Sequence, residues 1–103
     1  MEAAVLAREI QFEDARGRGL SALEAEDGRT ALDYLTRAAQ MRPLRADIHL
    51  FVSLAALRVG EAPVARAAAA RAAELCPRIL ETRPGEQALR MGLPRNLLEG
   101  TRR

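Results

Sequence analysis

The sequence contains no lysine and no tryptophan, and among its 103 residues it has one cysteine, one histidine and three aromatic residues. A single cysteine excludes an internal disulfide and is typical of a reducing compartment. Strand-forming β-branched and aromatic residues are sparse, so we expect almost no sheet. Ala, Leu, Arg and Glu dominate instead, and all four are strong helix formers. The composition therefore predicts an all-α fold.

Motifs for nucleotide and metal binding are also missing from the sequence. It has no phosphate-binding loop and no dinucleotide fingerprint, and Gly17 and Gly19 lie in a helical pattern that no strand precedes. A nucleophilic thiol with its base would require Cys76 and His49 to meet. We interpret Cys76 as a small packing residue and His49 as a partly exposed one. We therefore predict a protein that is not an enzyme and has no cofactor, metal ion or small-molecule substrate.

Charge and hydropathy argue against two further classes of partner. Acidic and basic residues balance over residues 1–78, and the net charge of +2 comes from residues 79–103. Binding to nucleic acid needs a concentrated basic face, which this distribution does not provide. The longest strongly apolar stretch, Leu50 to Leu57, is far shorter than the roughly 20 residues that cross a bilayer. With an acid at Glu2, the first residues do not resemble a signal peptide, so we expect a cytoplasmic protein.

Glycine and proline divide the chain into segments of helical length. Gly28, Pro43, Gly60 and Pro77 stand between runs of helix-forming residues, where they mark turns. Short turns of this kind make consecutive helices antiparallel neighbours. The pattern predicts four main helices, over residues 3–25, 28–41, 45–58 and 62–76.

The remainder of the chain, residues 79–103, is interrupted by proline and glycine every few residues. This spacing is incompatible with a long helix. We predict an irregular C-terminal tail that forms short helical turns, near residues 86–91 and 94–99, or is flexible. The helical domain then comprises residues 1–78.

The helical domain contains an internal repeat. When residues 12–45 are laid over residues 46–79, small and turn-forming residues coincide at a shift of 34 positions. Tetratricopeptide repeats, which are helix-turn-helix units, have this period. The sequence resembles this family at three coincident pairs, namely Ala31 with Ala65, Ala38 with Ala72 and Pro43 with Pro77.

The resemblance extends to other positions of the family's pattern. Its small residue midway along the first helix of each repeat corresponds to Gly19 and Ser53, and its turn glycine to Glu26 and Gly60. The large aromatic positions depart from the pattern, because they hold Ala15 and His49, Ala22 and Ala56, and Leu35 and Ala69. The resemblance implies two degenerate repeats that stack as an α-solenoid and pack through small side chains. An unrelated four-helix assembly is the alternative.

The third predicted helix is apolar on nearly all sides, and such a helix needs cover on both faces. In the family that the chain resembles, one face of this helix packs within the stack and the other lines a concave groove. The resemblance implies a partner-binding groove with an apolar centre, formed by Leu20, Leu23, Leu50, Phe51, Leu54 and Leu57. Its charged rim would comprise Arg16 and Arg58, together with Glu13, Glu24 and Asp47.

Burying the six apolar side chains could supply on the order of 10 kcal/mol before ordering costs, at about 1.5–3 kcal/mol each. The groove could be covered by a helix or peptide of a partner protein, by the chain's own tail or N-terminal turn, or by a second copy. We expect a protein-interaction module, an adaptor or chaperone, similar in design to the small tetratricopeptide chaperones of bacterial type III secretion. The alternative is a structural unit that assembles with its own copies through apolar helix faces.

Overall fold

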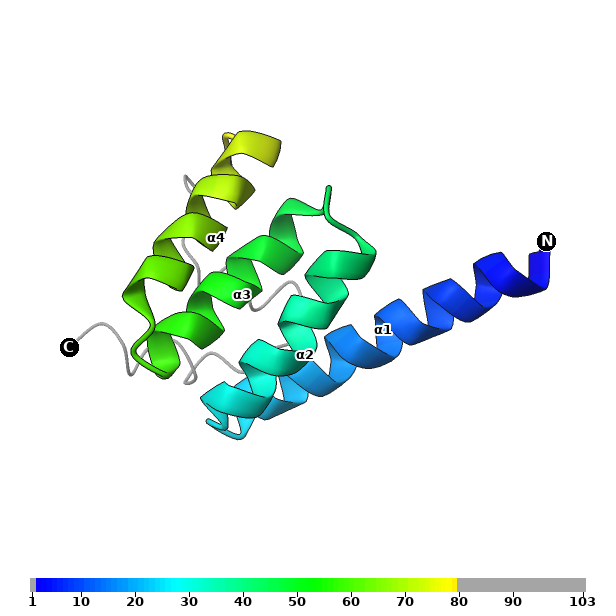
Figure 1. Ribbon diagram of the computed structural model, residues 1–103, viewed down its shortest axis with the longest axis horizontal. Coiled ribbons are helices and arrows are strands. Elements are labelled where there is room, and N and C mark those ends of the chain that lie inside the picture. Colours follow the sequence, from blue (N-terminus) through cyan, green and yellow to red (C-terminus); the bar gives the residue numbers. More distant parts are fainter. Residues whose placement is uncertain (1, 80–103) are drawn as a thin grey trace.

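The computed structural model describes residues 2–79, which form four α-helices (Figure 1). Within this range there is no strand, so the predicted all-α fold is confirmed, and each predicted helix boundary agrees to within one residue. None of these helices is long and apolar enough to cross a membrane. The tail predicted for residues 79–103 lies, except for Ile79, outside the described residues. The helices are α1 (Glu2–Glu24), α2 (Gly28–Met41), α3 (Ala46–Arg58) and α4 (Ala62–Leu75).

The helices pack in the order of the chain. In Figure 1, α1 lies beside α2, α2 beside α3 and α3 beside α4, and α1 also touches α3. The N-terminal part of α1 extends beyond the other helices, and its residues from Glu2 to Gln11 are all exposed. The buried residues of the described chain therefore begin at Phe12.

The backbone repeats at the shift of 34 positions that the sequence predicts. Glu26 and Gly60 occupy the same place in the two turns, and both have positive φ, at 63° and 78°. Their amides donate hydrogen bonds to the carbonyls of Leu23 and Leu57, at 3.0 and 3.2 Å. Each first helix, α1 and α3, is therefore followed by a left-handed residue of the kind that ends helices.

The ends of the second helices repeat in the same way. α2 begins after Asp27 and α4 after Glu61, and both of these residues have φ of −92°. Asp27 also accepts a hydrogen bond from the Thr30 amide at 3.2 Å through its side chain, whereas Glu61 makes no such cap. Arg42 and Cys76, which end the two helices, each donate an amide hydrogen bond to the carbonyl four residues back. One backbone unit is thus used twice.

In each repeat a small residue allows the two helices to approach. Gly19 of α1 lies against Leu35 of α2, and a β-carbon added at Gly19 would stand 2.6 Å from the Leu35 Cγ. Ser53 occupies the same place in α3, where its buried hydroxyl donates to the Ala65 carbonyl of α4 at 2.9 Å. A larger residue at either position would force the helices apart.

A separate cluster surrounds Phe12, whose side chain is fully buried. The guanidinium carbons of Arg42 and Arg45 lie 5.4 and 5.1 Å from the centre of its ring, which is cation–π range. Arg42 also pairs with Glu9 of α1, and Arg45 pairs with Asp47 of α3 at 2.7 Å. These contacts join α1 to the end of α2 and the start of α3.

Gly17 and Gly19 provide a matched test of the close approach, since both lie within α1. Gly19→Ala should destabilise the protein by about 1–3 kcal/mol, because the new methyl group overlaps Leu35. Gly17→Ala, where nothing lies within 4 Å, should stabilise it by up to about 1 kcal/mol through helix propensity. Urea unfolding followed by circular dichroism measures both changes, and a shift of the same sign in both variants would contradict this packing.

The two turn residues provide a second matched pair. Glu26→Gly should stabilise the protein by about 0.5–1 kcal/mol, because glycine adopts positive φ without a steric cost. Gly60→Ala should destabilise it by a similar amount for the same reason. Thermal unfolding of both variants is the measurement. A lower midpoint for Glu26→Gly would show that its side chain contributes more than its backbone conformation costs.

Candidate partner-binding surface

The two repeats allow each surface to be compared with its own copy. Residues 34 positions apart occupy the same place on their repeat. The face of the first repeat that meets the second is buried, whereas the same face of the second repeat meets no further repeat within residues 2–79. A residue that is exposed where its counterpart is buried therefore marks the surface that lacks a neighbouring helix in the described chain.

On the first repeat this face is formed by leucines of α1 and α2. Leu23 and Leu35 are 1% and 0% exposed, and Leu20 and Leu32 are also buried. The second repeat covers these leucines with α3, whose residues in the same cluster are Phe51, Val52, Ala55 and Ala56.

The same face of the second repeat is more exposed and carries a charge. Leu57, the counterpart of Leu23, is 60% exposed, and Leu54, the counterpart of Leu20, is partly buried. On α4 an exposed arginine, Arg66, and a small alanine stand where α2 has two buried leucines. We call this surface the open edge, which consists of Leu54, Leu57, Arg66, Ala69 and Ala73.

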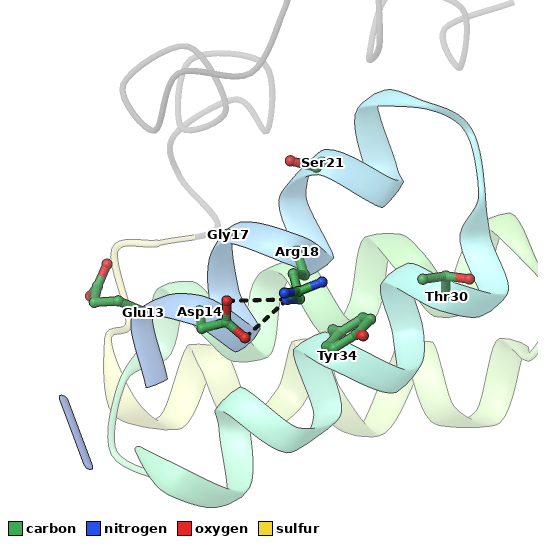
Figure 2. Close-up of a pocket in the computed structure, with 7 residues that line it drawn as sticks. All are labelled: Glu13, Asp14, Gly17, Arg18, Ser21, Thr30 and Tyr34. Atoms are coloured by element: carbon green, nitrogen blue, oxygen red, sulfur yellow. Dashed lines mark hydrogen bonds and ion pairs between the residues drawn. The ribbon is translucent and has the colours of Figure 1, made fainter. Parts of the chain in front are cut away.

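The opposite edge is polar and contains a hollow of about 690 Å³ between α1 and α2 (Figure 2). At its centre the Nε of Arg18 donates to both carboxylate oxygens of Asp14, at 3.1 and 3.0 Å. The guanidinium carbons of Arg18 and Arg37 lie 5.9 and 5.2 Å from the centre of the Tyr34 ring. The hydrogen bond with Asp14 raises the pKa of Arg18 above its ordinary value. This polar edge consists of Glu13, Asp14, Gly17, Arg18, Ser21, Thr30 and Tyr34.

The counterparts of the polar edge in the second repeat are mostly apolar and buried. Phe51 stands at the place of Gly17, and Val52 at the place of Arg18, and both belong to the main core. Ala55, the counterpart of Ser21, is likewise buried. The two edges of the described stack therefore differ in chemistry, and the open edge is the better candidate for an apolar partner.

Four of the six apolar residues predicted to line the groove are buried. The first of these, Leu50, packs with Ala72 and Ile79 in a small cluster, and the other three lie in the main core. Leu54 and Leu57 lie on the open edge. The predicted set therefore supplies both core and surface. Its members in the main core are Leu20, Leu23 and Phe51.

The predicted rim is charged, and most of its charges have partners nearby. Arg16 pairs with Glu13 at 2.8 Å, one helical turn away in α1. Arg58 is exposed in the last turn of α3, and its Cβ lies close to the backbone of Gly28. Asp47 is held by Arg45. Glu24, the remaining rim residue, is exposed at the end of α1.

Two surfaces are not apparent from the sequence-based prediction. The first is the charged part of the open edge, at Arg66. The sequence alone suggests only a solvated arginine there, but Arg66 occupies the repeat position of the buried Leu32, which places it on the open edge. The second is the exposed start of α1, where Val5, Leu6 and Ile10 are 60–61% exposed. No sequence signal indicates how far α1 extends past α2, because the helical pattern is continuous from Glu2 to Glu24.

His49 and Cys76, the pair considered for thiol chemistry, have separate contacts. The Nε2 of His49 donates to the Pro43 carbonyl at 2.8 Å. Cys76 is partly buried and packs against the cluster that contains Leu50 and Ala72. Each side chain thus has a packing or hydrogen-bonding role at the start of α3 or the end of α4.

No protein-family model, curated protein or solved structure matches the chain.

Proposed function

We propose that the chain is a tetratricopeptide-type interaction module, an adaptor or chaperone, that holds an apolar helical segment of a partner protein. Two observations support the family assignment. The sequence coincides at a shift of 34 positions, and the turns, helix caps and left-handed residues of the backbone coincide at the same shift. Repeats of this kind stack by covering one another's apolar faces.

The observation that carries the binding function is the exposure of Leu57. Its counterpart, Leu23, is almost fully buried beneath the second repeat, so the same apolar position is covered in one repeat and exposed in the other. Together with Leu54, it leaves an apolar surface beside Arg66. An apolar centre with a charged border is suited to accept an amphipathic helix.

The predicted groove residues take different parts in this function. Leu20, Leu23, Leu50 and Phe51 hold α3 in place as core residues, and Leu54 and Leu57 contact the partner. Of the predicted rim charges, Arg16 pairs with Glu13 on α1 and Arg58 lies against Gly28 of α2, so Arg66 is the charge that borders the open edge. The function involves a protein partner and cytoplasmic location, with no catalysis, cofactor, metal ion, nucleic acid or membrane span.

A second candidate function is assembly of the chain with its own copies. The observation that favours it is the exposed start of α1, where Val5, Leu6 and Ile10 could pack on another copy's open edge. Direct stacking of one copy's open edge on another's polar edge is unfavourable, because it would bury Asp14 and Arg18. Light scattering over a concentration series separates the two functions, since assembly raises the mass above 11.2 kDa.

Leu57→Asp tests the binding function. The variant should lose the partners that the wild-type protein captures from native lysate, because a carboxylate in the centre of the apolar surface cannot be desolvated cheaply. Folding should be little affected, since Leu57 is 60% exposed. Quantitative mass spectrometry of the captured proteins is the readout, with circular dichroism to show that the helices are retained.

Leu44→Asp is the matched control for this experiment. Leu44 is 74% exposed in the turn between α2 and α3, away from the open edge, so the same chemical change is made elsewhere on the surface. The control should capture the same partners as the wild-type protein. Equal capture by both aspartate variants would exclude Leu57 from the binding surface and with it this function.

A further inference from the structure

We propose that the helix accepted by the open edge carries an apolar stripe like that of α3 and one carboxylate that faces Arg66. This inference rests on the proposed function and specifies the chemistry of the partner. It follows from a surface that occurs in both repeats. In the first repeat this surface is covered by α3, and in the second it is the open edge.

The occupied copy is the face of the first repeat, on which α3 lies. The α3 residues buried on this side follow the 3–4 spacing of one helical face. A β-carbon added at Gly28, at the start of α2, would stand 2.9 Å from the Cβ of Arg58, at the end of α3, so the two helices run antiparallel from that contact. Ala55 of α3 therefore lies near Leu32 of α2, and both are buried in one cluster. The stripe consists of Ile48, Phe51, Val52 and Ala55.

The open edge is the same face with two changes in α4. Ala69 stands where α2 has Leu35, so the surface is recessed there and leaves room for a larger apolar side chain. Arg66 stands where α2 has Leu32, so a cation now lies opposite the position that Ala55 holds in the occupied copy. A carboxylate at this position of an incoming helix would form charge-assisted hydrogen bonds with the guanidinium group. An apolar residue there would cover the charge without a partner, which is unfavourable.

The sequence that follows the described residues does not supply this occupant in the equivalent register. α4 ends at Leu75, and Ile79, the last described residue, is the counterpart of Arg45, which directly precedes α3. Continuing the shift of 34 positions places Pro84 within the equivalent of α3, where it is incompatible with a helix interior. At the same shift, the four residues of the apolar stripe correspond in order to Thr82, Gly85, Glu86 and Leu89. Three of these are not apolar side chains, and the residue at the place of Ala55 is Leu89, which has no carboxylate.

Fluorescence anisotropy with two labelled peptides tests the proposal on the full chain. Both peptides have the sequence of residues 45–59; one carries Ala55→Glu and the other Ala55→Lys. The wild-type protein should bind the glutamate peptide about tenfold more tightly, the effect of one charge-assisted hydrogen bond. Arg66→Glu should reverse the order of the two affinities, and Leu57→Asp should weaken both peptides.

Arg71→Glu is the matched control, because Arg71 lies on the same helix but pairs with Glu74 at 3.1 Å instead of facing the open edge. It should leave the preference for the glutamate peptide unchanged. An unchanged preference in Arg66→Glu would overturn the proposal, as would the absence of binding by either peptide. In the latter case, a mass above that of the monomer would identify a second copy as the occupant, and a monomer would leave the edge to residues 80–103.

The capture experiment and the peptide experiment can fail independently, so failure of the proposed function is distinguishable from failure of this inference. If capture of partners depends on Leu57 but the preference for the glutamate peptide does not depend on Arg66, the binding function stands. The inference that the partner helix carries a carboxylate is then wrong. If neither dependence is found, both proposals fail.

Discussion

The fold depends on the close approach of the two helices within each repeat. At Gly19 the absence of a side chain lets Leu35 sit directly on the backbone of α1, and at Ser53 a hydroxyl small enough to fit also satisfies the Ala65 carbonyl. Because the chain has only three aromatic residues, its helices approach closely and gain stability from many short-range contacts. This is why alanine can occupy the places where the resembled family has aromatic residues.

A stack of two repeats has two end faces that are not covered by a further repeat within the described residues. The chain makes one edge polar, with the Arg18–Asp14 ion pair and the Tyr34 ring, which lies within cation–π range of Arg18 and Arg37. On the other edge it keeps two leucines of the repeat, Leu54 and Leu57, and has Arg66 and Ala69 in place of the other two. An isolated protein that only needed to be stable would gain from making both edges polar. The difference between the edges therefore gives the stack a direction.

The helices and turns could be predicted from the sequence, because Gly28, Pro43, Gly60 and Pro77 act through local conformational preferences. The shift of 34 positions was likewise predictable from side-chain size alone. The burial of Leu23 was not, because Leu57, a leucine at the same repeat position, is exposed. Leu23 and Leu57 differ only in which helix lies next to them, and a linear pattern does not contain that information.

The start of α1 has a mechanical consequence. The exposed residues 2–11 extend over about 15 Å from Phe12 towards the N-terminus, at about 1.5 Å per residue, and Glu9 within this segment pairs with Arg42. A rotation of α1 on α2 by about 10° would move the tip of this arm by about 3 Å. A small change in the packing around Phe12 would therefore produce a larger displacement at Val5 and Leu6.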